Sequence, residues 1–402
     1  PKLFTASPGN GVVGTDLLLL MDLLFISTND AVPWGGSEEL WSGAAVRLAG
    51  EGHHVTASVW DHSPEPAPLG VLRDGGVTLR KRFERRIQRD RLQQAWATLL
   101  HGAPPMSVSN ELELLHGTKA DLVIFSVGYQ LCPKFLRMSK VLRERKQAYA
   151  VVVQLVIEGL PMNDGMTEAY AQAYAGAKQV WFVSEQNRQA TERELGLAFN
   201  HASLVHNPVD TATEVPAYPS TENGWSLAMV GALSPHHKGQ DLVIELMGRT
   251  KWRERPLHVS FFGQGGSRAT LERLVRLHGV HNVTFRGHVP EKAAIWSTHH
   301  AALFASRMEG RSLALQEAMA HGRMVISTDV GGARDLITDG VDGHLVSAPS
   351  VDALDDALER AWQARDQWAA MGLRARDRLL GWVPSDPLGY FANAVSRTAT
   401  DG

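Results

Sequence analysis

Cysteine is almost absent from this sequence: Cys132 is the only one among 402 residues. A single cysteine excludes an internal disulfide framework and is compatible with a reducing compartment, so we expect a cytoplasmic protein. Cys132 stands beside Pro133 after an apolar run, which is typical of a packed thiol rather than a nucleophile. The sequence also has no Cys/His pattern with the spacing of a metal site, and we therefore expect no bound metal.

Long hydrophobic runs and an excess of charge of one sign are absent as well. The longest apolar run near the start, 17–26, is interrupted by Asp22 and is too short to span a bilayer. Charged residues make up 21% of the chain and the formal net charge is −3, which favours neither a disordered chain nor a nucleic-acid-binding protein. The apolar share of 44% is typical of a globular protein.

The length of the chain predicts more than one domain, because a single hydrophobic core seldom serves this many residues. Residues 1–17 are rich in Gly, Pro, Ser and Thr, as in a linker or tail, and the chain begins with Pro1. We therefore expect a processed product or a fragment of a longer protein. Beyond the tail we predict an N-terminal domain over 18–215, a C-terminal domain over 216–383 and a final segment over 384–402.

The first half of the chain begins with a strand–loop–helix–strand unit. A buried strand over 18–27 leads to a turn with Gly35 and Gly36, and Ser37 is placed to cap a helix over 38–49. Another strand follows the glycines that end this helix. Such a unit is the building block of a doubly wound parallel sheet.

The second half repeats this pattern after a polar, proline-containing segment at 211–224. Its apolar periodicity predicts a helix over 238–246, strands over 258–262 and 301–304, and a helix over 313–320. We therefore predict an α/β protein of two Rossmann-like, doubly wound domains that face each other. Ligands of such sheets bind at the carboxyl ends of the strands, which places the site in the cleft between the domains.

A basic stretch interrupts the first half. Residues 80–91 hold seven basic side chains against Glu84 and Asp90, and these are Arg80, Lys81, Arg82, Arg85, Arg86, Arg89 and Arg91. One interpretation is the solvated face of a helix, with Phe83 and Ile87 as its buried stripe. The other is contact with an acidic acceptor or an anionic membrane, which would place the protein peripherally at the inner membrane face.

The segment at 309–317 is the strongest candidate for chemistry. Glu309 ends the loop after the strand 301–304, and 310–313 would present backbone N–H groups at the start of a helix, where phosphates bind. Glu317 lies one to two turns further on, and a carboxylate there can accept hydrogen bonds from a ribose diol. Two exposed helix carboxylates would give the same spacing. Because Asp-x-Asp does not occur in the sequence, a diphosphate would have to be neutralised by cations, amides and helix N-termini.

This segment reads Glu-Gly-Arg-Ser-Leu-Ala-Leu-Gln-Glu, and with Ala-Met-Ala-His-Gly at 318–322 and Gly-Val-Asp-Gly-His-Leu-Val at 340–346 it resembles glycosyltransferase family 4. Further matching motifs run over most of the chain in the order Trp34-Gly35-Gly36, Val183-Ser184-Glu185, Asn207-Pro208-Val209-Asp210, Lys238-Gly239, Gly263-Gln264-Gly265 and Phe285-Arg286-Gly287. The resemblance implies a GT-B fold in which 384–402 returns to the N-terminal domain. It also implies a hexosyltransferase that moves a sugar from a nucleotide-diphosphate sugar to a hydroxyl of a glycan, lipid or natural product, with retention and without a metal or other cofactor.

The resemblance also implies roles for individual residues. The two residues assigned to catalysis are Glu309, beside the hydroxyls of the donor sugar, and Lys238, paired with the diphosphate. Glu317 would bind the ribose. The other substrate-binding residues are Gly310 and the amides of Ser312 and Leu313 at the phosphates, His288 and Val289 near the base, and Gly35 and Gly36 in the N-terminal domain, where tight turns would equally require glycine.

The sequence departs from the family pattern at the phosphates. The usual arginine six residues before the lysine is Ala232, so we expect Arg311, or His236 or His237, to supply part of the missing charge. Ser312 replaces a usual glycine, and its hydroxyl could bind phosphate or cap the helix.

A second departure lies in the N-terminal domain, where many members have a histidine after the strand that matches 149–156. Gln154 and Glu158 are the nearest polar candidates. Two alternatives therefore stay open: a phosphorylase of the same family, and a catalytically inactive nucleotide-sugar-binding subunit. The joint presence of Lys238, Glu309 and Glu317 argues against the second of these.

Overall fold

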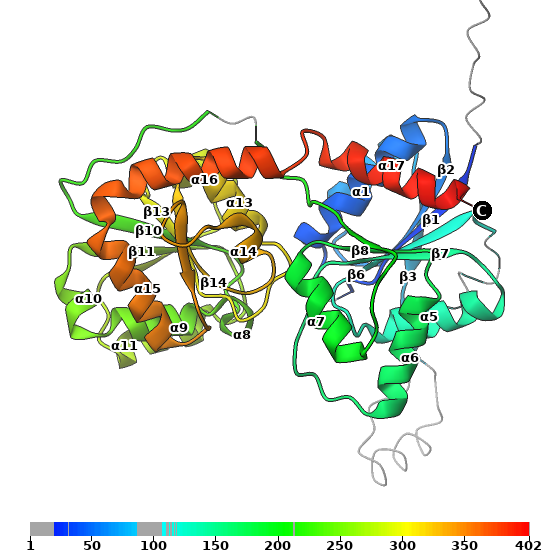
Figure 1. The fold of residues 1–402 in the computed structure, drawn as a ribbon, viewed down its shortest axis with the longest axis horizontal. Coiled ribbons are helices and arrows are strands. Elements are labelled where there is room, and N and C mark those ends of the chain that lie inside the picture. Colours follow the sequence, from blue (N-terminus) through cyan, green and yellow to red (C-terminus); the bar gives the residue numbers. More distant parts are fainter. Residues whose placement is uncertain are drawn as a thin grey trace, which may run out of the picture.

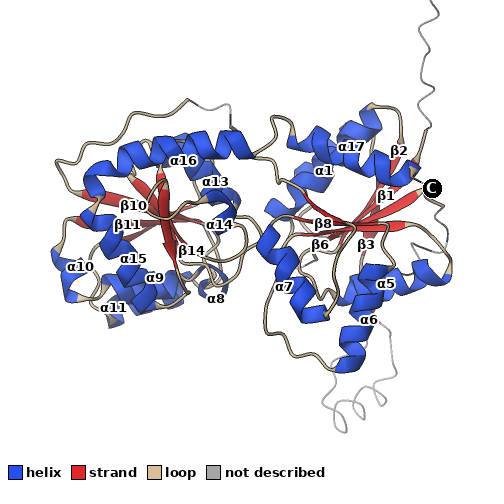
Figure 2. Cartoon of the chain, viewed as in Figure 1, coloured by secondary structure: helices blue, strands red, loops and turns tan. Residues whose placement is uncertain are grey.

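The computed structural model describes residues 20–30, 32–86, 107–109, 112, 115, 117, 119–211 and 214–401. Two parallel sheets, each lying between layers of helices, form two α/β domains side by side (Figure 1). Figure 2 shows the strands at the centre of each domain and the helices on both faces. The predicted class, two Rossmann-like α/β domains, is confirmed.

The first sheet has seven parallel strands in the order β3-β2-β1-β6-β7-β8-β9. Its central strands read as continuous apolar runs, because helices cover them on both faces. The strands are β1 (Asp22–Ser27), β2 (His54–Trp60), β3 (Thr78–Arg82), β6 (Leu122–Val127), β7 (Tyr149–Val153), β8 (Gln179–Phe182) and β9 (Ala202–Leu204).

Helices on the two faces of this sheet pack into two separate hydrophobic clusters. One face holds α1, α2 and the last helix of the chain, and the other holds α5, α6 and α7. The predicted cap by Ser37 is wrong, since α1 begins one residue earlier and has Gly35 as its N-cap residue. The bounds are α1 (Gly36–Gly50), α2 (Pro68–Asp74), α5 (Pro133–Glu144), α6 (Asp164–Ala175) and α7 (Glu185–Leu195).

The second sheet has six parallel strands in the order β12-β11-β10-β13-β14-β15. β13 pairs with β10 on one side and with β14 on the other, all in parallel, so the loops that follow β10 and β13 leave the sheet at the same edge. The strands are β10 (Trp225–Val230), β11 (Leu257–Phe262), β12 (Val283–Gly287), β13 (Ala301–Phe304), β14 (Met324–Thr328) and β15 (Gly343–Val346).

The helices of this domain again form two layers. Those on one face are α9 (Gln240–Met247), α10 (Thr250–Glu254), α11 (Arg268–Leu277) and α15 (Val351–Gln363), and those on the other are α12 (Lys292–Trp296), α13 (Leu313–Ala320), α14 (Ala333–Leu336) and α16 (Trp368–Trp382). A short 3-10 turn, Arg365–Gln367, precedes α16. The helix predicted over 238–246 is present as α9 but begins two residues later, because Gly239, at φ +72°, separates α8 (Pro235–Lys238) from α9.

The basic stretch is extended where the structure describes it. Residues 78–82 form β3, and β4 (Glu84–Arg86) pairs in antiparallel fashion with β5 (Ser107–Ser109). The helical interpretation is therefore wrong for these residues, while 87–91 lie outside the described ranges. Arg82 is buried and donates hydrogen bonds to the Ser58 carbonyl (2.7 Å) and to Asp30 (3.0 Å). Its charge is therefore paired inside the domain and is not presented on the surface. Of the helices in the described ranges, none has both the length and the apolar character needed to span a bilayer.

The chain ends on the first domain. After α16 it crosses over to α17 (Pro387–Thr400), which lies beside α1 (Figure 1). Phe391 of α17 is fully buried, and its ring meets that of Trp181 in β8 edge to face at a centroid distance of 5.1 Å. The last helix thus completes the core of the first domain and ties the second domain to it.

Removal of this anchor is expected to destabilise the protein. Phe391→Ala would leave a cavity beside Trp181, and we expect the free energy of unfolding to fall by about 3–5 kcal/mol. Denaturant titration of the full chain measures this change. Leu277→Ala, at an exposed position of α11, is the matched control and should change stability by less than about 0.5 kcal/mol. Equal effects of the two substitutions would refute an anchoring role for α17.

Candidate active site

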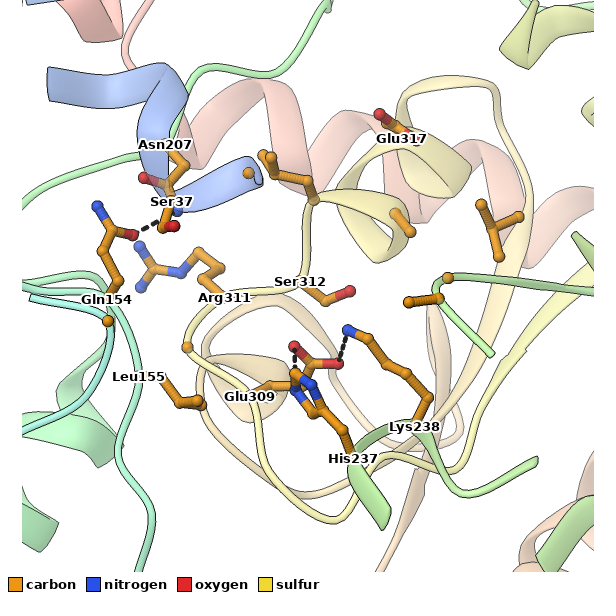
Figure 3. Close-up of a pocket in the computed structure, with 18 of the residues that line it drawn as sticks. Ser37, Gln154, Leu155, Asn207, His237, Lys238, Glu309, Arg311, Ser312 and Glu317 are labelled. Atoms are coloured by element: carbon orange, nitrogen blue, oxygen red, sulfur yellow. Dashed lines mark hydrogen bonds and ion pairs between the residues drawn. The ribbon is translucent and has the colours of Figure 1, made fainter. Parts of the chain in front are cut away.

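A pocket with a volume of about 450 Å³ lies between the domains, at the carboxyl ends of their strands. The first domain contributes residues at the start of α1 and after β6, β7 and β9, and the second contributes α8, α12 and the loop from β13 into α13 (Figure 3). The lining residues are Gly36, Ser37, Gly128, Gln154, Leu155, Asn207, Val230, Gly231, Ala232, His237, Lys238, Lys292, Glu309, Gly310, Arg311, Ser312, Leu313, Ala314 and Glu317.

At the floor of this pocket Lys238 and Glu309 form an ion pair. The Lys238 Nζ lies 2.6 Å from Oε1 of Glu309, the Ser306 hydroxyl donates to the same oxygen at 2.7 Å, and His237 Nε2 lies 3.8 Å from Oε2. Burial raises the pKa of Glu309, but the charges and hydrogen bonds of these neighbours outweigh it and hold the pKa below its usual value. Glu309 is therefore a carboxylate at neutral pH and accepts hydrogen bonds.

A glycine and an arginine bring Lys238 to Glu309. Gly239 packs so closely on the Ala305 backbone that a Cβ at this position would overlap with the Ala305 carbonyl. Arg307 fastens the same turn, since its backbone N–H donates to the His237 carbonyl at 2.8 Å and its guanidinium pairs with Asp241 at 2.8 Å. α8 and the loop after β13 therefore form one rigid unit.

The start of α13 faces the same pocket. Ser312 is the N-cap residue, and its hydroxyl accepts a hydrogen bond from the Leu315 N–H at 3.4 Å, so it caps the helix. Glu317 also lines the pocket, where Lys292 Nζ lies 3.4 Å from its Oε2. The structure thus gathers Glu309, Ser312 and Glu317 around one cavity.

A second cavity of about 330 Å³ continues from the main pocket. It is lined by His288 and Val289, and it shares Val230, Gly231, Ala232 and Lys292 with the main pocket. The two residues that we expected near a base therefore lie in a compartment next to the one that holds Glu317.

The first domain contributes mainly polar groups and small residues. Gly36, but not Gly35, is among the residues that line the main pocket. Gln154 lines it as well, and its Oε1 accepts a hydrogen bond from Asn207 Nδ2 at 3.1 Å. Glu158, the other polar candidate, pairs with Arg193 at 3.2 Å and is exposed. We did not assign Asn207 to the site from the sequence. Its position after β9, at the carboxyl edge of the sheet, could have indicated that it faces the cleft.

Arg311 lines the main pocket, but other groups engage its guanidinium. Its guanidinium is buried, pairs with Asp335 at 2.8 Å and lies over the Trp382 ring at 3.7 Å from the centroid. It points toward the first domain and away from Lys238 (Figure 3). Burial lowers the pKa of Arg311 to about 10 although Asp335 opposes the shift, and the group stays charged at neutral pH. Its charge is already balanced by Asp335, so this geometry gives no support to a phosphate role for the guanidinium.

The loop that carries Glu309 to Leu313 touches both domains. A Cβ at Gly310 would overlap with the Gln154 carbonyl, and a Cβ at Gly36 would meet the Leu313 side chain. In addition, Asn187 Nδ2 donates to the Glu309 carbonyl at 3.4 Å. The pocket and the domain junction therefore share one segment of chain.

Metal ligands are not gathered in the part of the chain that the structure describes: no three His, Cys, Asp or Glu side chains form a group that could hold an ion. The positive groups of the pocket are the side chains of Lys238, Lys292 and Arg311 and the first turn of α13. Burial, with the charge of Lys238 as a smaller cause, lowers the pKa of His237 below its usual value, so this ring is neutral at neutral pH.

Solved structures with the same arrangement of domains are GT-B glycosyltransferases, and the fold of this chain is GT-B. HepE of Anabaena, solved in complex with UDP and glucose, superposes with a TM-score of 0.71 at 15% identity, over 94% of this chain and 99% of that chain. TarM of S. aureus, in a complex with UDP, gives a TM-score of 0.68 at 12% identity, over 95% of this chain and 100% of that chain.

The sequence comparison falls mainly on the second domain. Residues 225–364 match the family model described as Glycosyl transferases group 1. A phosphatidylinositol N-acetylglucosaminyltransferase component of Arabidopsis thaliana is 26% identical over 46% of this chain and 42% of its own length. D-inositol 3-phosphate glycosyltransferase of Gordonia bronchialis is 31% identical over 39% of this chain and 36% of its own. The chain thus spans less than half the length of either relative.

The Arg311–Asp335 pair contacts the first domain at the Val205 carbonyl (3.5 Å) and the Glu185 N–H (3.4 Å), so loss of the Arg311 charge is expected to weaken the junction between the domains. Arg311→Met leaves Asp335 largely buried without its partner, so we expect the free energy of unfolding to fall by about 3 kcal/mol. The double variant Arg311→Met/Asp335→Asn should recover part of this loss, and denaturant titration measures both variants.

The neighbouring pair Arg334–Asp329 supplies the control, since the Arg334 side chain is exposed. Arg334→Met should change stability by less than about 1 kcal/mol. If Arg311→Met were no more harmful than Arg334→Met, the buried pair would not hold the junction together.

Proposed function

We propose that this protein is a retaining, metal-independent hexosyltransferase that moves a sugar from a nucleotide-diphosphate sugar to a hydroxyl acceptor. The observation that carries the proposal is the buried Lys238–Glu309 pair, at 2.6 Å, beside the start of α13 in a cleft between two Rossmann-like domains. The group 1 match over 225–364 and the GT-B neighbours support the same activity.

The pocket offers a partner for each part of such a donor. The ionised Glu309 accepts hydrogen bonds from the sugar hydroxyls, and Glu317 accepts them from the ribose. The N–H groups of Ser312 and Leu313, at the start of α13, and the ammonium of Lys238 face the diphosphate. His288 and Val289 border the compartment for the base.

In the proposed reaction the bond between the anomeric carbon and the diphosphate oxygen breaks, and the acceptor oxygen forms a bond to the same carbon. The leaving phosphate oxygen takes the acceptor proton on the same face of the sugar, so configuration is retained and no separate base is required. The charge that develops on the leaving diphosphate is stabilised by fixed dipoles and cations rather than by a bound metal. Gly310 lies close to the Gln154 carbonyl at the junction of the domains, and we propose that this junction limits the access of water to the reacting centre.

The acceptor enters from the first domain, beside Gly36, Gly128, Gln154 and Asn207. These groups are uncharged and hydrogen-bonding, as suits a hydroxyl compound. Two of the relatives are named for phosphatidylinositol and for inositol 3-phosphate, which are both polyhydroxy compounds. The chemical class that we propose for this chain is therefore a polyhydroxy acceptor, of glycan, lipid or natural-product origin.

A panel of UDP- and GDP-sugars tests this proposal. We expect one donor to bind by calorimetry and to release its nucleoside diphosphate slowly by hydrolysis and faster with a polyhydroxy acceptor. EDTA should leave the rate unchanged, and NMR of the product should show the anomeric configuration of the donor. Release of a sugar phosphate in the presence of inorganic phosphate would favour a phosphorylase. Binding without turnover for every acceptor would favour an inactive subunit.

Glu309→Gln is expected to separate catalysis from nucleotide binding. The amide keeps the size of the side chain but loses the charge that Lys238 and the sugar hydroxyls recognise, so turnover should fall by about 10²-fold. Affinity for the nucleoside diphosphate should hold or rise, because Lys238 is released toward the phosphates. Steady-state rates and calorimetry measure the two quantities.

Glu168→Gln, at an exposed position of α6, is the matched control and should behave as the wild type. If Glu309→Gln kept both its turnover and its nucleotide affinity, the donor-sugar role of Glu309 would be refuted.

A further inference from the structure

The main pocket holds few cations that are available to a ligand. Its basic side chains are His237, Lys238, Lys292 and Arg311. His237 is neutral at neutral pH, and Lys238 and Arg311 are each held by a carboxylate, at 2.6 and 2.8 Å. Lys292 is thus the basic side chain of this pocket with the least engaged charge.

Three ion pairs border the pocket, and they differ in the distance between their charges and in their exposure to solvent. The side chains of Lys238 and Glu309 are 19% and 12% exposed, and those of Arg311 and Asp335 are 0% and 15% exposed. Lys292 and Glu317 are 36% and 25% exposed and lie 3.4 Å apart, beyond the usual length of a charge-assisted hydrogen bond. An incoming anion will therefore open the pair between Lys292 and Glu317 most easily, because its charges are the best solvated of the three.

The position of Lys292 is as informative as its charge. Lys292 and Ala232 both line the main pocket and the adjoining cavity, so both stand at the passage between the two. A nucleoside diphosphate that extends from the base compartment to Glu309 must pass this point. The small side chain of Ala232 leaves its part of the passage without a cation, and Lys292, on a flexible stem at the start of α12, lines the same passage.

We propose that Lys292 is the second cation that binds the diphosphate of the donor, and that it exchanges Glu317 for the phosphates when the ribose binds. This inference rests on the proposed function and names a specificity residue of the same site. Both partners gain from the exchange: the ribose diol donates to Glu317 while the phosphate oxygens accept from Lys292. The released ion pair is thus replaced on both sides by groups of one ligand, so no buried charge is left unpaired.

Calorimetry with UDP and GDP and NMR titration with uridine and guanosine test the exchange. Lys292→Met should weaken binding of the preferred nucleoside diphosphate by about tenfold, as expected for one partly solvated charge-assisted hydrogen bond. The same substitution should leave affinity for the matching nucleoside unchanged or raise it, because Glu317 is then free for the ribose. It should also flatten the salt dependence of diphosphate binding.

The chain offers both a control and a rescue. Lys140→Met removes an exposed lysine from α5 and should leave diphosphate affinity within twofold of the wild type. Ala232→Arg combined with Lys292→Met restores a cation to the passage, and should recover most of the lost affinity for the diphosphate. A structural role of Lys292 would not be rescued in this way.

The outcomes are distinguishable. If Lys292→Met bound the diphosphate within twofold of the wild type, or lost affinity for nucleoside and diphosphate alike, Lys292 would not be the second cation. If the wild-type protein bound neither UDP nor GDP, the proposed function itself would fail. Selective loss for the diphosphate, together with rescue by Ala232→Arg, would establish the exchange.

Discussion

The buried carboxylate of Glu309 is the constraint on which the site depends. A charge in this position is stable only with a close cation, and Lys238 supplies it at 2.6 Å from a turn that precedes α9. That distance requires α8 to lie directly on the loop after β13, which Gly239 permits and Arg307 secures. The helix break at Gly239, which the apolar periodicity does not show, is thus part of the geometry that brings Lys238 to Glu309.

The same loop explains how the pocket and the domain junction act together. Its backbone meets the first domain at Gln154 and Asn187, while the Arg311 side chain is held between Asp335 and Trp382. Any motion that separates the domains must therefore shift the segment that carries Glu309 and Ser312. Under the proposed function, closure of the domains and assembly of the donor site would be coupled through this loop, as suits an enzyme that must exclude water before its substrate reacts.

Much of the fold could be predicted because its strands are buried on both faces and its helices have clear apolar periods. The strand at 301–304 and the helix at 313–320 match β13 and α13 in the structure. The errors have local causes. Gly239 ends a helix inside a helical pattern, and Gly35 rather than Ser37 is the N-cap residue of α1. Residues 80–82 and 84–86 belong to strands, and a count of charged residues does not distinguish a strand from a helix.

By itself, the sequence determined the α/β class and the segments that meet at the cleft, since parallel strands present their carboxyl ends to one edge. It did not determine which charges pair there. Arg311 pairs with Asp335 and lies over the Trp382 ring, and Lys292 faces Glu317 from another element. Only the tertiary structure decided these partners, because the free energy of a charge depends on its burial and on neighbours that are remote in the chain. The local periodicity of apolar residues contains no information on either.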